Sequence, residues 1–370
     1  MENKENKITL DNRHIATKIS SIVPLESLDL SKVNNFSDLA KGMSLTSFGG
    51  RQLGEAVDVL EAMIKDKDCL KVMTLSGAMT MAKMGLVICD MIENGMIDII
   101  VSTGALMAHG FVESAGMIHY KNPGKFTDEE LYKMGYDRVY DTLELEENLD
   151  DADAIFRNVL KNMDHNKIFS SHTINRELGR YLIENTKGRG ILKSAFEHNI
   201  PVFVPAFSDS EFGLNFAMHN RERKMKNLKP LVFDPFIDLE KYTDMVFNAK
   251  KMGIFTIGGG VPRNWAQQVG PYLDALRFRF VDKEDPNKYF IKDKTNPYLK
   301  KFQYAVRICP EPAHWGGLSG CTYSEGVSWG KFLSKNQGGR YAEVICDATI
   351  AWPIIVKAVL ERLDKNTIKL

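Results

Sequence analysis

The sequence predicts an α/β protein, with a doubly wound, mostly parallel sheet and helices on both of its faces. Two observations lead to this class. Apolar residues along the chain switch repeatedly between the helical period and the strand period. The expected strands are also short and apolar throughout, which is typical of strands that are buried on both faces of a parallel sheet.

The chain divides into residues 1–45, expected to form a loosely structured N-terminal arm, and residues 46–370, expected to form a single domain. An amphipathic pattern predicts a helix over residues 52–66, after which the segments alternate in type. Strands are predicted over residues 70–75, 97–102, 201–206, 253–257 and 344–348, and further helices over residues 78–93 and 350–363.

The acidic run over residues 143–153 allows two interpretations. Its carboxylates could bind a cation, but carboxylates also cap helices at their N-terminal ends. We expect a solvated connection whose aspartates cap a helix beginning near Ala152.

Composition excludes several classes of function. Lys and Arg together number 48, as do Asp and Glu, so there is no net positive field to attract nucleic acid or an anionic membrane. The N-terminus is polar, and charged residues interrupt the most apolar run, residues 84–101. We therefore expect neither a signal peptide nor a membrane span.

The spacing of cysteines and histidines bears on redox and metal chemistry. The five cysteines include no Cys-x-x-Cys pair, which predicts reduced thiols and a cytoplasmic protein. The eight histidines form no recognisable ligand pair, so no metal site is expected.

Three segments are candidate sites because ligands of open α/β sheets bind outside the carboxyl ends of the strands. In the first, Gly258, Gly259 and Gly260 follow a predicted strand, and Pro262 can begin a helix. Three glycines let the backbone approach a nucleotide closely, but a tight turn also needs glycine. The residues alone do not favour either the nucleotide site or the tight turn.

The second candidate is Asp209, which lies between Ser208 and Ser210 after another predicted strand. Its carboxylate could bind the hydroxyl groups of a ribose. All three residues are also good helix N-caps, and the residues alone favour this second interpretation.

The third candidate runs from Glu325 to Lys331 and contains Trp329. A carboxylate can pair with an ammonium group, and a Trp face can pack against methylenes or a cation. A lysine that is desolvated beside Trp can form an imine with a carbonyl carbon. Most lysines are simply exposed, however, and the residues alone favour that interpretation for Lys331.

The segment from Glu325 to Lys331 resembles the active-site segment of deoxyhypusine synthases, in which the lysine of a Ser-Trp-Gly-Lys run is the covalent nucleophile. The resemblance extends from about residue 35 to residue 363 and includes the triple glycine and residues 347–353. It implies a doubly wound fold, a homotetramer with sites at subunit interfaces, and NAD as the cofactor that takes hydride from spermidine.

The resemblance also implies roles for particular residues. Lys331 would be the nucleophile, and the residues that bind the amine substrate would be Glu325, Trp329 and Asn264. The residues that match NAD-binding positions of the family are Asp209, Gly258, Gly259, Gly260, Asp347 and Thr80.

Several positions depart from the family pattern. In the first strand-helix turn, Ala78, Met79 and Thr80 replace the Thr-Ser-Asn type contacts to NAD. Three further departures concern the amine site. Asn264 replaces a histidine, and Leu214 and Leu318 stand where acidic residues are expected. Acidic residues would hold the ammonium groups of a polyamine through charge-assisted hydrogen bonds worth about 1.5–3 kcal/mol each. The pattern is similar to that of bacterial deoxyhypusine synthase-like proteins, and it indicates a changed amine specificity.

The leading hypothesis is an NAD-dependent transferase that moves an aminobutyl group from a polyamine, through an imine on Lys331, to a small amine acceptor, as in homospermidine formation. One alternative is a true deoxyhypusine synthase that modifies a lysine of a translation factor, and the three departures argue against it. The other is a non-catalytic scaffold, which would have no need to retain Glu325, Trp329 and Lys331 together.

Overall fold

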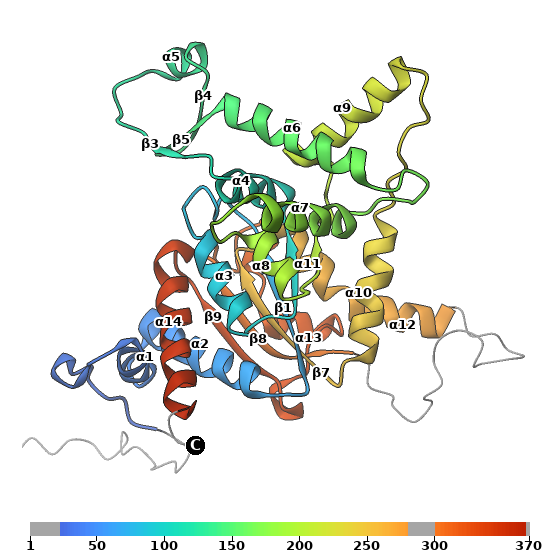
Figure 1. Ribbon diagram of the computed structural model, residues 1–370. Coiled ribbons are helices and arrows are strands. Elements are labelled where there is room, and N and C mark those ends of the chain that lie inside the picture. The colour runs from blue at the N-terminus through green and yellow to red at the C-terminus, as the bar shows by residue number, and fades with distance from the viewer. Residues whose placement is uncertain (1–22, 280–299, 368–370) are drawn as a thin grey trace, which may run out of the picture.

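The computed structural model describes residues 23–279 and 300–367, and it confirms the α/β class (Figure 1). Its centre is a six-stranded sheet in which all neighbouring strands are parallel. The strands of this sheet are β1 (Cys69–Leu75), β2 (Ile99–Ser102), β6 (Val202–Phe203), β7 (Lys251–Ile257), β8 (Phe302–Ile308) and β9 (Arg340–Val344).

The strand order β6-β2-β1-β7-β8-β9 is doubly wound. The chain runs outward from β1 through β2 to β6, then returns to the other side of β1 and continues through β7 to β9. The order reverses between β1 and β7, whose last residues Leu75 and Ile257 are aligned in register. The crevice at such a reversal is where ligands of this fold bind.

Alternation along the strands divides the core into two layers, one on each face. Val72 and Ile254 belong to one hydrophobic cluster, and Met73 and Phe255 belong to the other. The first cluster is completed by α10 (Phe236–Asn248), α11 (Gly260–Gln267), α12 (Val269–Arg279) and α13 (Tyr323–Ser328). Helices of the second cluster include α2 (Phe48–Lys65), α3 (Gly85–Glu93), α4 (Gly104–Ser114), α7 (Ser171–Asn185), α8 (Ile191–Glu197) and α14 (Ala348–Thr367).

A smaller unit extends from the main body beside α6 (Glu146–Asn162), which packs in turn against α9 (Glu211–Met225), as Figure 1 shows. It contains an antiparallel sheet in the order β3-β5-β4. Its elements are β3 (Tyr120–Lys121), α5 (Asp128–Lys133), β4 (Tyr136–Val139) and β5 (Thr142–Leu145). Short 3-10 helices elsewhere are η2 (Leu30–Lys32), η3 (Leu318–Gly320) and η4 (Lys335–Gln337).

The helices and strands agree in type with the predicted segments but differ at several bounds. The helix predicted over residues 78–93 begins only at Gly85, because residues 76–84 form turns in which Lys83 has a φ of 62°. The last strand was predicted over residues 344–348, whereas β9 ends at Val344. Strand β8 was missed altogether, although it lies inside the sheet.

The acidic run is also organised differently from the prediction. Glu144 belongs to β5 and is 1% exposed, and α6 begins at Glu146, well before Ala152. The expectation of a solvated connection was therefore wrong, because this part of the run is a strand that turns a carboxylate inward.

Two further sequence-based expectations can be compared with the described residues. All five cysteines are free thiols, as predicted. No helix within residues 23–279 and 300–367 is both long and apolar enough to cross a membrane.

Part of the predicted N-terminal arm is folded onto the domain. Helix α1 (Phe36–Ser44) packs against α2 and α14, and residues 1–22 lie outside the described residues. The approach to α2 is close at Gly54, where an added Cβ would lie 2.4 Å from Ser44 N and 2.5 Å from Ala40 O. A glycine in α2 is thus what lets the two helix backbones touch.

Replacing Gly54 by Ala should lower the free energy of unfolding by about 1–3 kcal/mol, because the methyl group overlaps the backbone of α1 and forces the helices apart. Chemical denaturation measures the effect. Gly49→Ala is the matched control, since no atom lies within 4 Å of the added methyl group and the change should stay within about 0.5 kcal/mol. Equal stability of the two variants would contradict the packing of α1.

Candidate active site

The backbone of Lys331 is fixed between a helix end and the beginning of a strand. Lys331 N donates to Gly326 O at 3.0 Å, and Lys331 O accepts from Phe302 N at 2.9 Å. The turn that joins α13 to Lys331 passes through Gly330, whose φ of 70° favours glycine. The glycine of the Ser-Trp-Gly-Lys run therefore has a conformational role.

The side chain of Lys331 lies among the residues expected to bind substrate. Its Nζ donates to Asn264 Oδ1 at 3.2 Å and lies 5.9 Å from the ring centre of Trp329. Partial burial lowers the pKa of Lys331, and the positive charge of Arg263 lowers it further, while Cys321 and Glu325 act in the opposite direction. A lowered pKa enlarges the neutral fraction of the amine, which is the form that attacks carbon.

Two buried arginines hold the loop that leads into this segment. Arg263 donates to Ser319 O at 3.0 Å and to Cys321 O at 2.7 Å. Arg307 donates to the same two oxygens at 2.7 Å and 2.6 Å, and also to Glu343 Oε2 at 3.0 Å.

Glu343 joins this arginine pair to helix α13. Its Oε1 accepts from Tyr323 N, the first residue of α13, at 2.5 Å. The helix start, the loop and two strands are thereby connected through charged side chains. Glu325, Trp329 and Lys331 all stand on the segment that this network positions.

Sequence reasoning missed Arg263, Arg307, Glu343 and Tyr323. A signal existed for one of them, since Arg307 is a charged residue in an otherwise largely apolar strand, Phe-Gln-Tyr-Ala-Val-Arg-Ile. A charge at such a position requires a buried partner. The partner itself could not be identified, because it comes from the adjacent strand β9.

The triple glycine forms a turn at the reversal point of the sheet. Gly258 has a φ of 74°, and Gly259 N donates to Ser76 Oγ at 2.8 Å. A Cβ on Gly259 would lie 2.7 Å from Ser319 Cα, so this turn packs against the arginine-held loop. Gly260, with a φ of 63°, has open space where a Cβ would stand. The three glycines do form a tight turn, and their role in binding a nucleotide stays a prediction.

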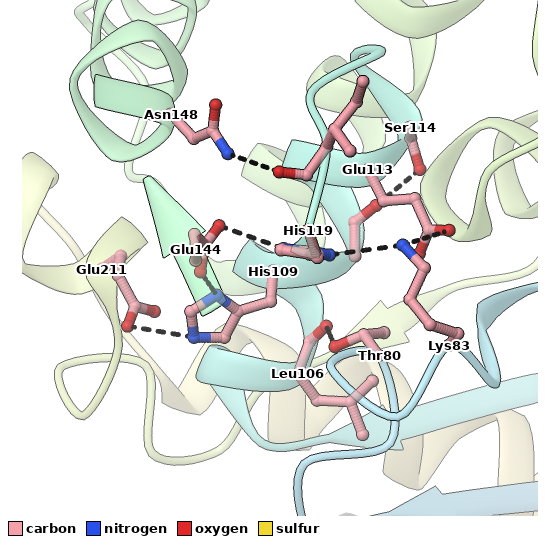
Figure 2. Close-up of polar contacts among 12 residues, drawn as sticks. Thr80, Lys83, Leu106, His109, Glu113, Ser114, His119, Glu144, Asn148 and Glu211 are labelled. Carbon is pink, nitrogen blue, oxygen red and sulfur yellow. Dashed lines mark hydrogen bonds and ion pairs between the residues drawn. The ribbon is translucent and has the colours of Figure 1, made fainter. Parts of the chain in front are cut away.

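The other expected cofactor residues occupy different environments. Asp209 follows β6 and is exposed, while Ser210 is the N-cap of α9, as the capping interpretation predicted. Asp347 follows β9, is exposed, and accepts a hydrogen bond from Thr349 N at 2.7 Å. Thr80 is fully buried and donates to Leu106 O at 3.0 Å, so its hydroxyl does not face a ligand (Figure 2).

The structure therefore brings Asn264, Glu325 and Trp329 to Lys331, and it places Asp209, the glycines and Asp347 after the carboxyl ends of β6, β7 and β9. This arrangement is that of a doubly wound α/β protein in which a partly buried lysine amine lies beside an amide and an indole ring.

Comparison with known proteins gives the family. A family profile described as deoxyhypusine synthase matches residues 38–359. The chain belongs to the deoxyhypusine synthase family, whose members are aminobutyl-transferring enzymes, and it is a transferase of this kind.

Individual relatives support the same assignment. A protein of Methanosarcina acetivorans named "Probable deoxyhypusine synthase 2" is 34% identical over 334 residues, covering 90% of this chain and 88% of the relative. The "Deoxyhypusine synthase-like protein" of Chlorobaculum tepidum is 32% identical over 337 residues, covering 90% of this chain and 88% of the relative.

Among solved structures, an Entamoeba histolytica protein assigned as a deoxyhypusine synthase has the same fold. Its TM-score is 0.55 at 15% identity, covering 91% of this chain and 97% of that one.

Replacing Arg263 by Met should raise the pKa of Lys331, because the change removes the positive charge that disfavours the ammonium form. At neutral pH the neutral fraction of Lys331 then falls, and its labelling by an amine-reactive reagent moves to higher pH. Peptide mass spectrometry across a pH series measures the midpoint for Lys331.

Arg263→Lys is the matched variant, since it keeps the charge and should retain a midpoint close to that of the wild type. Exposed Lys335 is the internal reference in the same digest. Circular dichroism checks that each variant is folded. A midpoint for Lys331 that is the same in Arg263→Met as in the wild type would show that Arg263 does not tune the amine.

Proposed function

We propose that this protein is an NAD-dependent transferase that moves an aminobutyl group from a polyamine, through an imine on Lys331, to a small-molecule amine, as in homospermidine formation. One observation supports this proposal most directly. Lys331 is partly buried, its pKa is lowered, and its Nζ donates a hydrogen bond to Asn264 Oδ1 at 3.2 Å. A lysine in this setting is suited to nucleophilic attack on an imine carbon.

The proposed role of Lys331 is covalent. Its neutral amine adds to the oxidised carbon of the donor, the bond from that carbon to the donor's own nitrogen breaks, and the aminobutyl group remains as an imine on Nζ. The acceptor amine then adds to the same carbon, and the bond to Nζ breaks. Glu325, in the first turn of α13, would pair with the free ammonium end of the aminobutyl group.

Asn264 acts differently from the histidine that the family pattern places there. A carboxamide neither gains nor loses a proton near neutral pH, so Asn264 orients the Lys331 amine through its Oδ1 and does not serve as an acid or base. Trp329 is 66% exposed and offers a ring face to methylenes or an ammonium group.

The residues at the sheet reversal fit a dinucleotide. Gly260 begins α11 directly after β7 and has open space where a Cβ would stand, and exposed carboxylates of Asp209 and Asp347 follow β6 and β9. These residues would hold NAD, which when bound accepts hydride from the donor amine and returns it to the product. Thr80 is left out of the proposed set because its hydroxyl is buried against α4.

Two substitutions relative to the family pattern support an amine other than spermidine in its usual pose. Leu214 is 60% exposed and Leu318 is 76% exposed, at positions where acidic residues would hold ammonium groups. Leucine provides no such bond, and each lost bond is worth about 1.5–3 kcal/mol.

Exposed apolar side chains also support assembly around the site. Trp315, Leu318 and Trp329 lie on or near the lysine segment and are each at least 60% exposed. Large exposed apolar side chains that are close along the chain are candidates for an interaction surface. A homotetramer with its sites at subunit interfaces would cover them, and that is the assembly we propose.

Incubating the protein with NAD and a panel of polyamines, followed by borohydride, should leave a mass of one reduced aminobutyl group on Lys331. The reason is that borohydride reduces an imine to a stable secondary amine. Peptide mass spectrometry locates the adduct. Lys331→Arg keeps the charge but cannot form the imine, and Lys335→Arg is the matched control that should still be labelled at Lys331.

The acceptor is tested in the same system without borohydride. Loss of the adduct on adding putrescine, with appearance of homospermidine, supports the small-molecule acceptor. Transfer only to a translation-factor lysine would instead identify a true deoxyhypusine synthase. No adduct with any donor, together with equal behaviour of Lys331→Arg and wild type in every assay, would contradict the proposed chemistry.

NAD at 100 times its Kd should raise the free energy of unfolding by about 2.7 kcal/mol, because the ligand binds only the folded chain. Thermal denaturation with and without NAD measures this shift. Asp209→Ala should reduce the shift, whereas Glu240→Ala, an exposed change on α10, should leave it unaltered. A wild type without any shift would count against NAD as the cofactor.

A further inference from the structure

A buried cluster away from Lys331 joins His109, His119 and Glu144 (Figure 2). His109 lies on α4, His119 in the segment that follows α4, and Glu144 on β5. The side chains of His119 and Glu144 are each 1% exposed, and that of His109 is 16% exposed. Three potential metal ligands from three segments thus meet in the interior.

The distances in the cluster are close to those of a metal site. His109 Nδ1 lies 2.7 Å from Glu144 Oε2, and His119 Nε2 lies 3.1 Å from Glu144 Oε1. The candidate ligand atoms all lie within 4.8 Å of one another. Four-coordinate zinc, with bonds of about 2.0–2.2 Å, holds its ligand atoms about 3.3 Å apart. Small side-chain rotations would therefore bring the three ligands onto one ion.

The contact between His109 and Glu144 is short but is not a well-formed hydrogen bond. His109 Nδ1 is buried and has no hydrogen-bond partner among the described residues, although Glu144 Oε2 is close. A nitrogen lone pair and a carboxylate oxygen repel each other, so the contact is favourable only with a proton on Nδ1 or with a metal ion bound to both atoms.

The outer residues are arranged as around a metal-bound histidine. Glu211 Oε1 lies 3.6 Å from His109 Nε2, and the other carboxylate oxygen of Glu211 is buried without a hydrogen-bond partner in the described part of the chain. Histidine ligands commonly donate their second ring N–H to such a carboxylate. The cluster also has more carboxylates than ammonium groups, which favours a cation. The carboxylates are those of Glu113, Glu144 and Glu211, and the ammonium group is that of Lys83.

We propose that His109 Nδ1, His119 Nε2 and the Glu144 carboxylate bind one first-row divalent transition-metal ion, with Zn²⁺ as the representative cation. Water completes the coordination from the partly exposed side of His109, and Glu211 orients the His109 ring. This ligand set of two imidazoles and a carboxylate suits zinc and its neighbours, and it does not suit calcium or magnesium. The ion ties the β3-β5-β4 sheet to α4, independently of the function proposed for Lys331.

Lys83 competes with the ion. Its Nζ lies 3.3 Å from His119 Nδ1, where it donates to the ring and leaves the ring proton on Nε2. Metal binding through Nε2 moves that proton to Nδ1, so Lys83 must turn away toward Glu113, to which it is already paired at 2.8 Å. Removing the ammonium of Lys83 should therefore strengthen metal binding.

Chelator-treated full-length protein titrated with Zn²⁺ should bind one ion per chain with high affinity, as measured by calorimetry and by metal analysis after dialysis. Co²⁺ should give the visible absorption of a four- or five-coordinate site. Hydrogen exchange of the backbone amides of residues 118–145 should slow when Zn²⁺ is bound, because the ion fixes β5 to α4. Mg²⁺ should produce none of these effects.

Variants assign the ligands. His109→Gln and His119→Gln should each abolish stoichiometric binding, Glu211→Gln should weaken it by about 10–100-fold, and Lys83→Met should tighten it. His198→Gln, an exposed histidine elsewhere, is the matched control and should bind as the wild type does. Thermal denaturation of the metal-free variants confirms that each is folded.

Failure of wild-type protein to bind Zn²⁺ stoichiometrically would overturn the proposal. So would binding that His109→Gln and His119→Gln retain at wild-type strength, since the ion would then be held elsewhere on the chain. An unchanged exchange rate over residues 118–145 in the zinc-bound protein would equally exclude this cluster. If a variant unfolds, the Co²⁺ spectrum and the hydrogen exchange of the wild-type protein still test the proposal, because neither measurement depends on a variant.

Discussion

Two buried guanidinium groups, those of Arg263 and Arg307, converge on the same pair of carbonyl oxygens, Ser319 O and Cys321 O. Glu343 is the carboxylate that pairs with Arg307, and it also fixes the first amide of α13. Buried cations are stable only when they are paired and hydrogen-bonded, so the loop has little freedom to move. The position of Lys331 and its lowered pKa both depend on this arrangement.

The doubly wound sheet determines where that network can act. Its strand order reverses between β1 and β7, and the triple-glycine turn that follows β7 packs directly against Ser319. The turn at the proposed cofactor crevice and the loop that leads to the lysine are therefore in contact. Protein interiors have low compressibility, so a shift of the backbone at either one should displace the other.

The smaller unit is attached by a second charged cluster of a different kind. Around Lys331 the buried charges are cations that bind backbone oxygens, whereas beside β5 the buried charge is the carboxylate of Glu144 between two imidazoles. Each cluster joins segments that are distant along the chain. Charged side chains inside this protein thus fix the orientation of segments that the apolar core alone would leave adjustable.

Local pattern in the sequence determined the fold class, most strands of the central sheet, a few of the helices, and the segment from Glu325 to Lys331. Short apolar strands and the 3.6-residue period depend on neighbouring residues only. Contacts between distant residues could not be read in this way. Tertiary structure alone decided that Asn264 meets Lys331, that Thr80 is buried against α4, and that Glu144 faces two histidines. The physical reason is that sheet order, and not sequence spacing, brings these side chains together.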